Sequence, residues 1–397
     1  MIDSARGGAG ATGAASTAGI ASGGGRPPGR IRPSAGVRAT VQLGSGRVES
    51  IEIGSLSLES GAVLRDVHVA YRHDGPGPGA APQVVLVHAL TGSADAAGDW
   101  WARVVGPGKA IDTDRVGVVC ANLLGGRYGT TGPTSRDPAT GRPYGRAFPE
   151  LTPRDMARAQ WLLLDALGIR HVALLAGGSL GGMVAQELAF ERPASVGVLL
   201  SIAAPAEVGA LALAWDHIQL ELVDRLGEEG MDLARRLALT TYRSEADFDS
   251  RFGRGREDDG RLSIVSYLTY QGQKLIDRFD PDTYRTLVTA MDAHDVGRGR
   301  GGTAAAFRAL APGGSGPTGS PGTRLIGVGI VGDILYGPVQ VRALVEAAAA
   351  AGVDARYREF QSDKGHDAFL AEWTVLDRLL REAMDEALAV VPARADR

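Results

Sequence analysis

One serine of this 397-residue chain stands in a pattern typical of an activated nucleophile. Ser179 occupies the centre of Gly177-Gly178-Ser179-Leu180-Gly181, between the apolar run 171–176 and the helical pattern 183–190. A strand, a G-x-S-x-G turn and a helix in that order predict a nucleophile elbow, whose small residues permit a strained turn and whose helix N-terminus favours negative charge. By itself the motif is also compatible with a glycine-rich turn that does no chemistry.

A serine hydroxyl is a weak nucleophile at neutral pH, so it requires a base and an acid that orients the base. After such an elbow the acid comes first in the chain and the histidine last. Asp333 ends the apolar run 324–333, and His366 lies in the loop SDKGHDAFL before the final helical pattern. We therefore predict a Ser179–Asp333–His366 triad. His294 falls in a charged helical region away from the strand ends, and we expect a structural role for it.

Acyl transfer also requires two N–H donors for the oxyanion of its tetrahedral intermediate. We expect one from Leu180, directly after the nucleophile, and one from Leu90 in the strand-end loop VLVHALTGS. His88 is expected to hold that loop. The prediction includes no metal ligands.

The elements that position these residues alternate between strands and helices. Several strand-like runs are continuously apolar, which indicates strands covered on both faces, and helical patterns lie between them. This alternation predicts an α/β fold with a doubly wound, mostly parallel sheet. Residues 39–204 and 322–397 form the predicted core, residues 205–321 a helical lid insertion, and residues 1–38 a disordered Gly/Ala-rich leader.

Composition excludes several classes of function. With 42 Lys and Arg against 46 Asp and Glu, the formal net charge of −4 argues against nucleic acid or an anionic membrane as a partner. No stretch reaches the ~18–20 apolar residues of a membrane helix. The single cysteine, Cys120, cannot form an internal disulfide, which fits a cytoplasmic location.

Over residues 38–380 the sequence resembles the homoserine O-acetyltransferase family. The resemblance rests on long ordered motifs: HALTGS, LGGRYGTTGP, GGSLGGM, VSYLTYQGQKLIDRFDPDTYRTLVTAMDAHDV and GHDAFL. It implies an α/β-hydrolase fold and a ping-pong transfer from acetyl-CoA, or another acyl-CoA, through Ser179 to a hydroxyl of homoserine or a related molecule. It also implies the same triad, acyl-CoA as a co-substrate rather than a permanently bound cofactor, and a homodimer formed through the lid helices.

The acceptor site departs from the family pattern. Leu220 takes the place expected for an arginine that grips the acceptor carboxylate, whereas Thr91 and Asp367 carry over as acceptor contacts. Arg127 either substitutes for that arginine or faces solvent or the CoA phosphates. The segment 297–302, GRGRGG, either attracts CoA phosphates or is a solvated loop.

Other functions remain compatible with these motifs. A serine O-acetyltransferase or a secondary-metabolite O-acyltransferase of the same family would use the same triad, and so would an esterase with a wetter tunnel. A non-catalytic binding module is the third class, and an intact triad argues against it.

Overall fold

The computed structural model describes residues 39–43, 46–314 and 321–390, all within the compact unit Pro33–Arg397. The leader predicted for residues 1–38 lies outside the described residues. Among the described residues, no helix combines the length and apolar composition needed to cross a bilayer.

The centre of the fold is a nine-stranded sheet of the described residues, in the order β1-β2-β3-β5-β4-β6-β7-β8-β9. Six neighbouring strands, β5-β4-β6-β7-β8-β9, pair in parallel. The strands β1, β2 and β3 form an antiparallel edge, in which β3 pairs with β5. This confirms the mostly parallel sheet. The strands are β1 (Ala39–Leu43), β2 (Gly46–Ser57), β3 (Val63–Asp74), β4 (Gln83–Val87), β5 (Gly117–Ala121), β6 (Val172–Gly178), β7 (Val196–Ile202), β8 (Arg324–Ile330) and β9 (Ala355–Phe360).

The central strands are buried on both faces, as their continuous apolar runs predict. Alternate residues of β4 point into two different cores: Val85 and Val87 into one, Val84 and Leu86 into the other. The first core also contains α1 (Pro153–Ala166), α2 (Leu180–Glu191) and α9 (Pro338–Ala350), and the second contains α10 (Trp373–Val390). Two helical layers therefore enclose the sheet.

Helix α1 shows how the local sequence sets an element boundary. Thr152 accepts a hydrogen bond from the Asp155 amide while the Asp155 carboxylate accepts one from the Thr152 amide, and Pro153 occupies the first helical position. This reciprocal capping box satisfies N–H groups that the first helical turn leaves unpaired. Thr152 and Pro153 thus set the point at which α1 begins.

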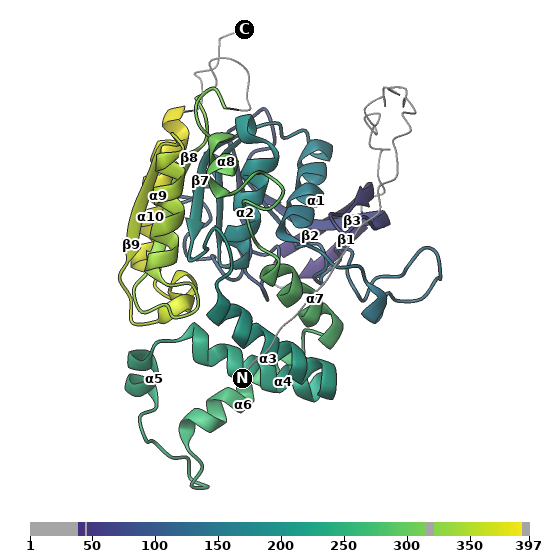
Figure 1. Cartoon of the computed structure of the whole chain (residues 1–397), viewed down its shortest axis with the longest axis vertical. Helices are drawn as coiled ribbons and strands as arrows, with labels where there is room; N and C mark the ends of the chain where they lie inside the picture. The colour runs from purple at the N-terminus through teal and green to yellow at the C-terminus, as the bar shows by residue number, and fades with distance from the viewer. Residues whose placement is uncertain (1–38, 44–45, 315–320, 391–397) are drawn as a thin grey trace, which may run out of the picture. The chain divides into compact units, whose positions relative to one another are not determined.

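A run of helices separates β7 from β8. In Figure 1 the helices α3 to α6 lie together below the sheet, and α4 contacts both α6 and the short 3-10 helix η3 (Gly365–Leu370). We call the helices α3 to α8 the lid. Their bounds are α3 (Ala210–Leu226), α4 (Glu228–Tyr242), α5 (Glu245–Arg251), α6 (Ser263–Ile276), α7 (Pro281–Asp292) and α8 (Thr303–Arg308).

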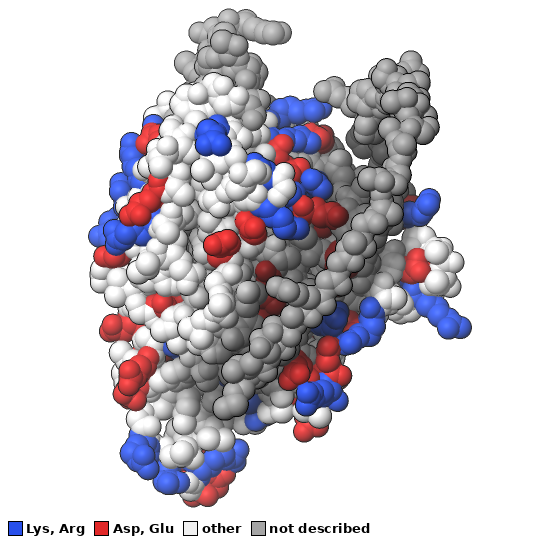
Figure 2. Space-filling model, in the orientation of Figure 1, with Lys and Arg blue, Asp and Glu red and all other residues white. Residues whose placement is uncertain are grey.

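Positive and negative side chains are interspersed on the face shown in Figure 2, so this face carries no extended patch of one sign. That distribution agrees with the small net charge of the whole sequence.

Candidate active site

Ser179 lies in a sharp turn between β6 and α2. Its backbone has φ 56° and ψ −130°, a conformation that non-glycine residues rarely adopt, and its amide donates to the Ile202 carbonyl at 2.9 Å. Such strain persists only where the surrounding structure holds it in place, and it concentrates at functional sites. The structure therefore has the predicted strand, turn and helix, with the serine at the helix N-terminus.

The glycines around Ser179 are required by packing. A Cβ atom on Gly177 would lie 2.3 Å from the Gly181 carbonyl oxygen, and one on Gly178 would lie 2.5 Å from the Phe369 ring. Close backbone approach thus explains why glycine, a poor helix former, is dense where a helix begins.

The Asp333 carboxylate is fixed directly after β8. Its Oδ1 accepts hydrogen bonds from the Leu335 and Tyr336 amides at 2.8 and 3.0 Å, and its Oδ2 lies 2.7 Å from His366 Nδ1. Burial alone would lower the pKa of His366, but the charge and hydrogen bond of Asp333 outweigh it and raise the pKa. The imidazole is therefore a stronger base than its burial would allow.

Aromatic rings surround this imidazole. The ring centroids of Tyr336, Tyr242 and Phe369 lie 5.5, 5.8 and 5.8 Å from that of His366. Among the described residues no hydrogen bond joins Ser179 to His366, although both side chains line the same pocket. Catalytic hydrogen bonds in ligand-free enzymes often tighten only when substrate binds.

The loop after β4 forms a tight turn beside Ser179. The Gly92 amide closes the turn by donating to the Ala89 carbonyl at 2.9 Å, and His88 Nδ1 lies 2.8 Å from the same oxygen. His88 Nε2 accepts from the Leu123 amide at 3.1 Å. Burial lowers the pKa of His88 to about 4, so the ring is neutral and holds the turn through one donor and one acceptor.

The amides expected to form the oxyanion hole lie on this turn and on α2. Leu90 lines the pocket, and Leu180 is the first residue of α2. Neither amide donates a backbone hydrogen bond among the described residues. Two unpaired N–H groups beside a serine have the composition of an oxyanion hole.

These residues enclose a pocket with a volume of about 200 Å³. Five of the predicted site residues line it: Ser179, His366, Leu90, Thr91 and Asp367. Asp333 does not line the pocket but contacts His366. The strands β4, β6, β8 and β9 all precede these residues, and the carboxyl ends of parallel strands meet at one edge of a sheet.

The lid contributes two arginines that sequence reasoning missed. Arg235 of α4 and Arg278, which follows α6, line the pocket, and neither has an acidic partner among the described residues. The guanidinium carbon of Arg235 lies 5.4 Å from the ring centre of Tyr242, another lining residue. Arg235 and Tyr242 are seven positions apart, so they share a helix face, and this spacing was an available signal.

Leu220, which takes the place expected for the family's arginine, does not line the pocket, whereas these two arginines do. Leu220, on α3, packs partly buried against the hydrophobic core, as an apolar side chain in a helical interface should. Arg127 does not reach the pocket either. Its guanidinium lies 3.6 Å from the Asp280 carboxylate and its side chain is 33% exposed, which agrees with the alternative that it faces solvent.

Asp367 lines the pocket, as expected, but it is not a free carboxylate. Its Oδ2 lies 3.1 Å from Arg243 Nε. An ammonium group would therefore share this carboxylate with a guanidinium.

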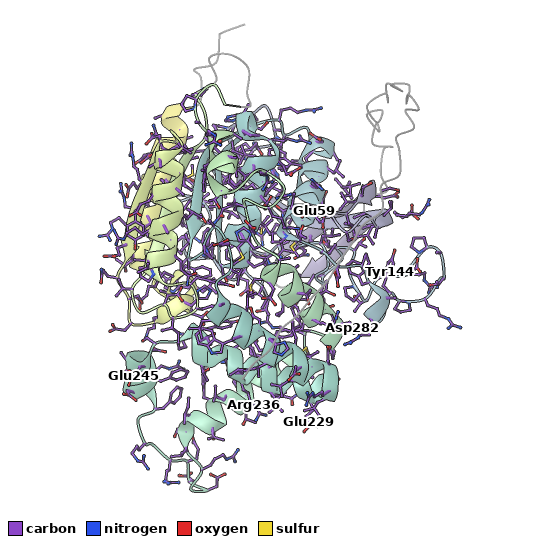
Figure 3. The ribbon with its side chains drawn as sticks, viewed as in Figure 1. Glu59, Tyr144, Glu229, Arg236, Glu245 and Asp282 are labelled. Atoms are coloured by element: carbon purple, nitrogen blue, oxygen red, sulfur yellow. The ribbon has the colours of Figure 1, made fainter. Side chains whose placement is uncertain are left out.

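The segment 297–302 is a mostly exposed loop, as one alternative predicted, and its two arginines are paired with carboxylates. Arg300 pairs with Glu187 at 2.6 Å and with Glu191 at 3.3 Å, and Arg298 pairs with Glu59 at 2.9 Å. Figure 3 shows Glu59 beside α1, where it also contacts Arg154. These side chains form an ion network that attaches the end of the lid to the core. His294, also in this region, is buried and bonds to the Pro205 carbonyl, which agrees with a structural role.

Comparison with known proteins agrees with this geometry. Residues 82–265 match the model of the alpha/beta hydrolase fold family. The chain is 39% identical to a homoserine O-acetyltransferase of Moorella thermoacetica over 83% of this chain and 94% of that one. It is 42% identical to one from Thermus thermophilus over 81% and 87%.

Solved structures agree on the fold. Homoserine O-acetyltransferase from Bacillus anthracis superposes with a TM-score of 0.76 at 21% identity, covering 85% of this chain and 97% of that one. With the elbow, the acid–histidine pair and the lid in place, these similarities show that the chain belongs to the homoserine O-acetyltransferase family of α/β-hydrolase-fold acyltransferases.

Proposed function

We propose that this protein transfers an acetyl group from acetyl-CoA to the side-chain hydroxyl of homoserine through an acetyl-Ser179 intermediate. The observation that carries the proposal is the pocket itself. It places Ser179 and the Asp333-supported His366 beside two arginines that have no acidic partner. The relatives named homoserine O-acetyltransferase support the choice of donor and acceptor.

In the first half-reaction His366 removes the Ser179 proton as the serine oxygen attacks the thioester carbonyl carbon. The oxyanion forms beside the Leu90 and Leu180 amides, which cost no reorganisation at that moment. When the oxyanion collapses, the C–S bond breaks, and the proton on His366 passes to the sulfur of the departing CoA. The serine keeps the acetyl group as an ester.

In the second half-reaction the acceptor hydroxyl gives its proton to His366 and its oxygen attacks the acetyl carbon. The bond to Ser179 breaks, and His366 returns the proton to the serine. Asp333 stays ionised throughout and stabilises the imidazolium that forms in each half. The lid covers the pocket, which limits the access of water to the acyl-enzyme.

The charges of the pocket suit a free α-amino acid. Arg235 offers a planar pair of N–H donors to a carboxylate, for which a leucine would be no substitute. Asp367, although paired with Arg243, supplies a negative group for the ammonium. Thr91 lines the same pocket as a further polar contact.

The direct test measures acceptor choice and the covalent intermediate together. Acetyl-CoA alone should add one acetyl group to the protein by intact mass, on Ser179, with release of an equivalent of CoA. Homoserine should then discharge it faster than serine does, and 3-aminopropanol, which lacks the carboxylate, should lose roughly 100-fold or more in kcat/KM.

Matched variants make the result decisive. Arg235→Gln should remove most of the preference for homoserine over 3-aminopropanol, and Ser179→Ala should prevent labelling while leaving the fold intact. Rapid hydrolysis of simple esters without any labelling by acetyl-CoA would refute the transferase and indicate an esterase. Turnover of serine or a larger hydroxylated compound in place of homoserine would refute the acceptor alone.

We also propose that the protein is a cytoplasmic homodimer joined through the lid. Large apolar side chains are exposed on two lid helices: Leu211 and Ile218 on α3, Val265 and Tyr270 on α6. A second copy that covered them would remove this apolar surface from water. Light scattering of the wild-type protein should give twice the mass of one chain, and Ile218→Asp should lower the measured mass to that of one chain. A monomeric wild-type protein would refute the dimer.

A further inference from the structure

Arg278 lies where the lid meets the turn after β4, and it binds that turn directly. It stands in the short link between α6 and α7. Its Nη1 donates to the Thr91 carbonyl at 2.9 Å, and its Nη2 donates to Thr91 Oγ1 at 3.3 Å. The two residues are 187 positions apart in the sequence, so this contact joins the lid to the core at the rim of the pocket.

The two ends of the turn are held by different parts of the molecule. The Ala89 carbonyl is held from within the core, by the Gly92 amide and by His88. Among the described residues, only Arg278 donates to the Thr91 carbonyl. The Thr91 carbonyl shares a peptide plane with the Gly92 N–H, and the Ala89 carbonyl shares one with the Leu90 N–H. The Gly92–Ala89 hydrogen bond joins the two planes, so a change at the Thr91 carbonyl reaches the Leu90 N–H.

Among the described residues, the side chain of Arg278 makes hydrogen bonds only with Thr91. No acidic side chain pairs with it among the described residues, and its buried Nε has no hydrogen-bond partner. Its nearest aromatic contact is the Phe279 ring, whose centre lies 5.9 Å from the guanidinium carbon. A partly buried cation without a carboxylate is costly unless negative charge develops near it.

We propose that Arg278 is a positioning residue for acyl transfer: through Thr91 it fixes the turn that presents the Leu90 N–H, so that the oxyanion hole is complete only when the lid is docked. This rests on the acyl-transfer chemistry proposed above and on the role given to Leu90. It does not depend on the identity of the acceptor.

The test uses 4-nitrophenyl acetate, whose attack by Ser179 needs the oxyanion hole but neither CoA nor an amino acid. Loss of one direct oxyanion donor costs about 10²–10³-fold in rate, so loss of a residue that only positions the donor should cost roughly 10–100-fold. We expect Arg278→Met to lower the acylation rate by that factor and to change KM less than about threefold. Arg278→Lys should recover part of the rate, because an ammonium can reach one Thr91 oxygen but cannot span both as the guanidinium does.

Coupling to Thr91 separates positioning from general stabilisation. Thr91→Val removes the hydroxyl contact and leaves the carbonyl one, and the double variant with Arg278→Met should lose less than the product of the two single effects. The control is Arg285→Met. Arg285 is a lid arginine on α7 that pairs with Asp224 at 3.2 Å, and it does not line the pocket. Its loss should leave acylation unchanged.

Three results would overturn the proposal. The first is acylation by Arg278→Met at the wild-type rate, the second is a fall no larger than that of Arg285→Met, and the third is a defect confined to KM for the amino-acid acceptor. The last would make Arg278 an acceptor ligand. If Arg278→Met does not fold, Arg278→Lys and Thr91→Val still decide the question. Failure of the proposed transferase function would appear as absent transfer from acetyl-CoA, while the ester assay would still report on Arg278.

Discussion

The ion pairs of the GRGRGG segment, residues 297–302, lead to a prediction that distinguishes a structural role of its arginines from phosphate binding. Arg300 contacts Glu187 through both oxygens, at 3.0 and 2.6 Å, and its guanidinium carbon lies 5.0 Å from the Phe190 ring centre. The side chain of Glu187 is only 2% exposed. We therefore expect Arg300→Met to destabilise the fold without changing KM for acetyl-CoA.

The magnitude follows from what remains after the substitution. Breaking a buried pair costs about 3–5 kcal/mol when the remaining charge loses its partner. Here Arg154 still lies 3.1 Å from Glu187 and keeps part of its charge compensated, so we expect a smaller cost of about 2–3 kcal/mol. Arg298, whose side chain is 40% exposed, should contribute only about 0–1 kcal/mol through Glu59.

The assay is urea unfolding of Arg300→Met, Arg298→Met and Arg308→Met, each followed by a measurement of KM for acetyl-CoA. Arg308 is exposed and has no ion pair among the described residues, so it is the matched control. Destabilisation should decrease from Arg300 to Arg298 to Arg308, with KM unchanged throughout. An Arg300 variant as stable as the control, or one with a tenfold higher KM for acetyl-CoA, would refute the reasoning and favour a phosphate-binding segment.

Three further predictions concern the pocket and the lid. Asp333→Asn should lower kcat by about 10⁴-fold. It should also move the acid limb of the pH–rate profile to lower pH, because His366 must be neutral to accept the proton and Asp333 raises the pKa of His366. Gly178→Ala should cost about 1–3 kcal/mol by overpacking and slow acylation, since the new Cβ would lie 2.5 Å from the Phe369 ring that packs on His366. Asp292→Asn should raise the melting temperature by roughly 2–4 °C at pH 9 and by less at pH 6.

The last two predictions have physical controls. Gly77→Ala adds a Cβ that meets nothing within 4 Å, so it should be tolerated where Gly178→Ala is not. For Asp292, burial and the neighbouring Asp216 raise its pKa to about 8. A raised pKa in the folded state means that stability present at low pH is lost as the pH rises through that value. An asparagine stays neutral, so equal melting shifts at pH 6 and pH 9 would contradict the assignment.

The fold and the nucleophile could be predicted because they depend on local patterns. Continuous apolar runs predict strands buried on both faces, and the glycines around Ser179 predict a turn between a strand and a helix. The order of acid and histidine along the chain then singled out Asp333 and His366, which lie 2.7 Å apart in the structure.

The lid could not be predicted in the same way. Its helices are amphipathic, and a helical pattern tells which residues share a face but not which face covers the pocket. For this reason the sequence indicates Leu220 at the position expected for an arginine, whereas in the structure Arg235, one helix later, lines the pocket. Arg127 likewise pairs with Asp280, a contact between distant parts of the chain that no local pattern predicts.

The sequence by itself determined the strand–helix order, the elbow at Ser179 and the acid and base that serve it, because each is specified by neighbours in the chain or by strand ends that a parallel sheet must bring together. Only the tertiary structure decided which charges meet. It left Arg235 and Arg278 without acidic partners beside the pocket, and it paired Arg298 and Arg300 with Glu59 and Glu187 away from it. The physical reason is that a guanidinium can form an ion pair, bind a ligand or remain in water. The packing of elements that are distant in the sequence decides which of these environments it occupies.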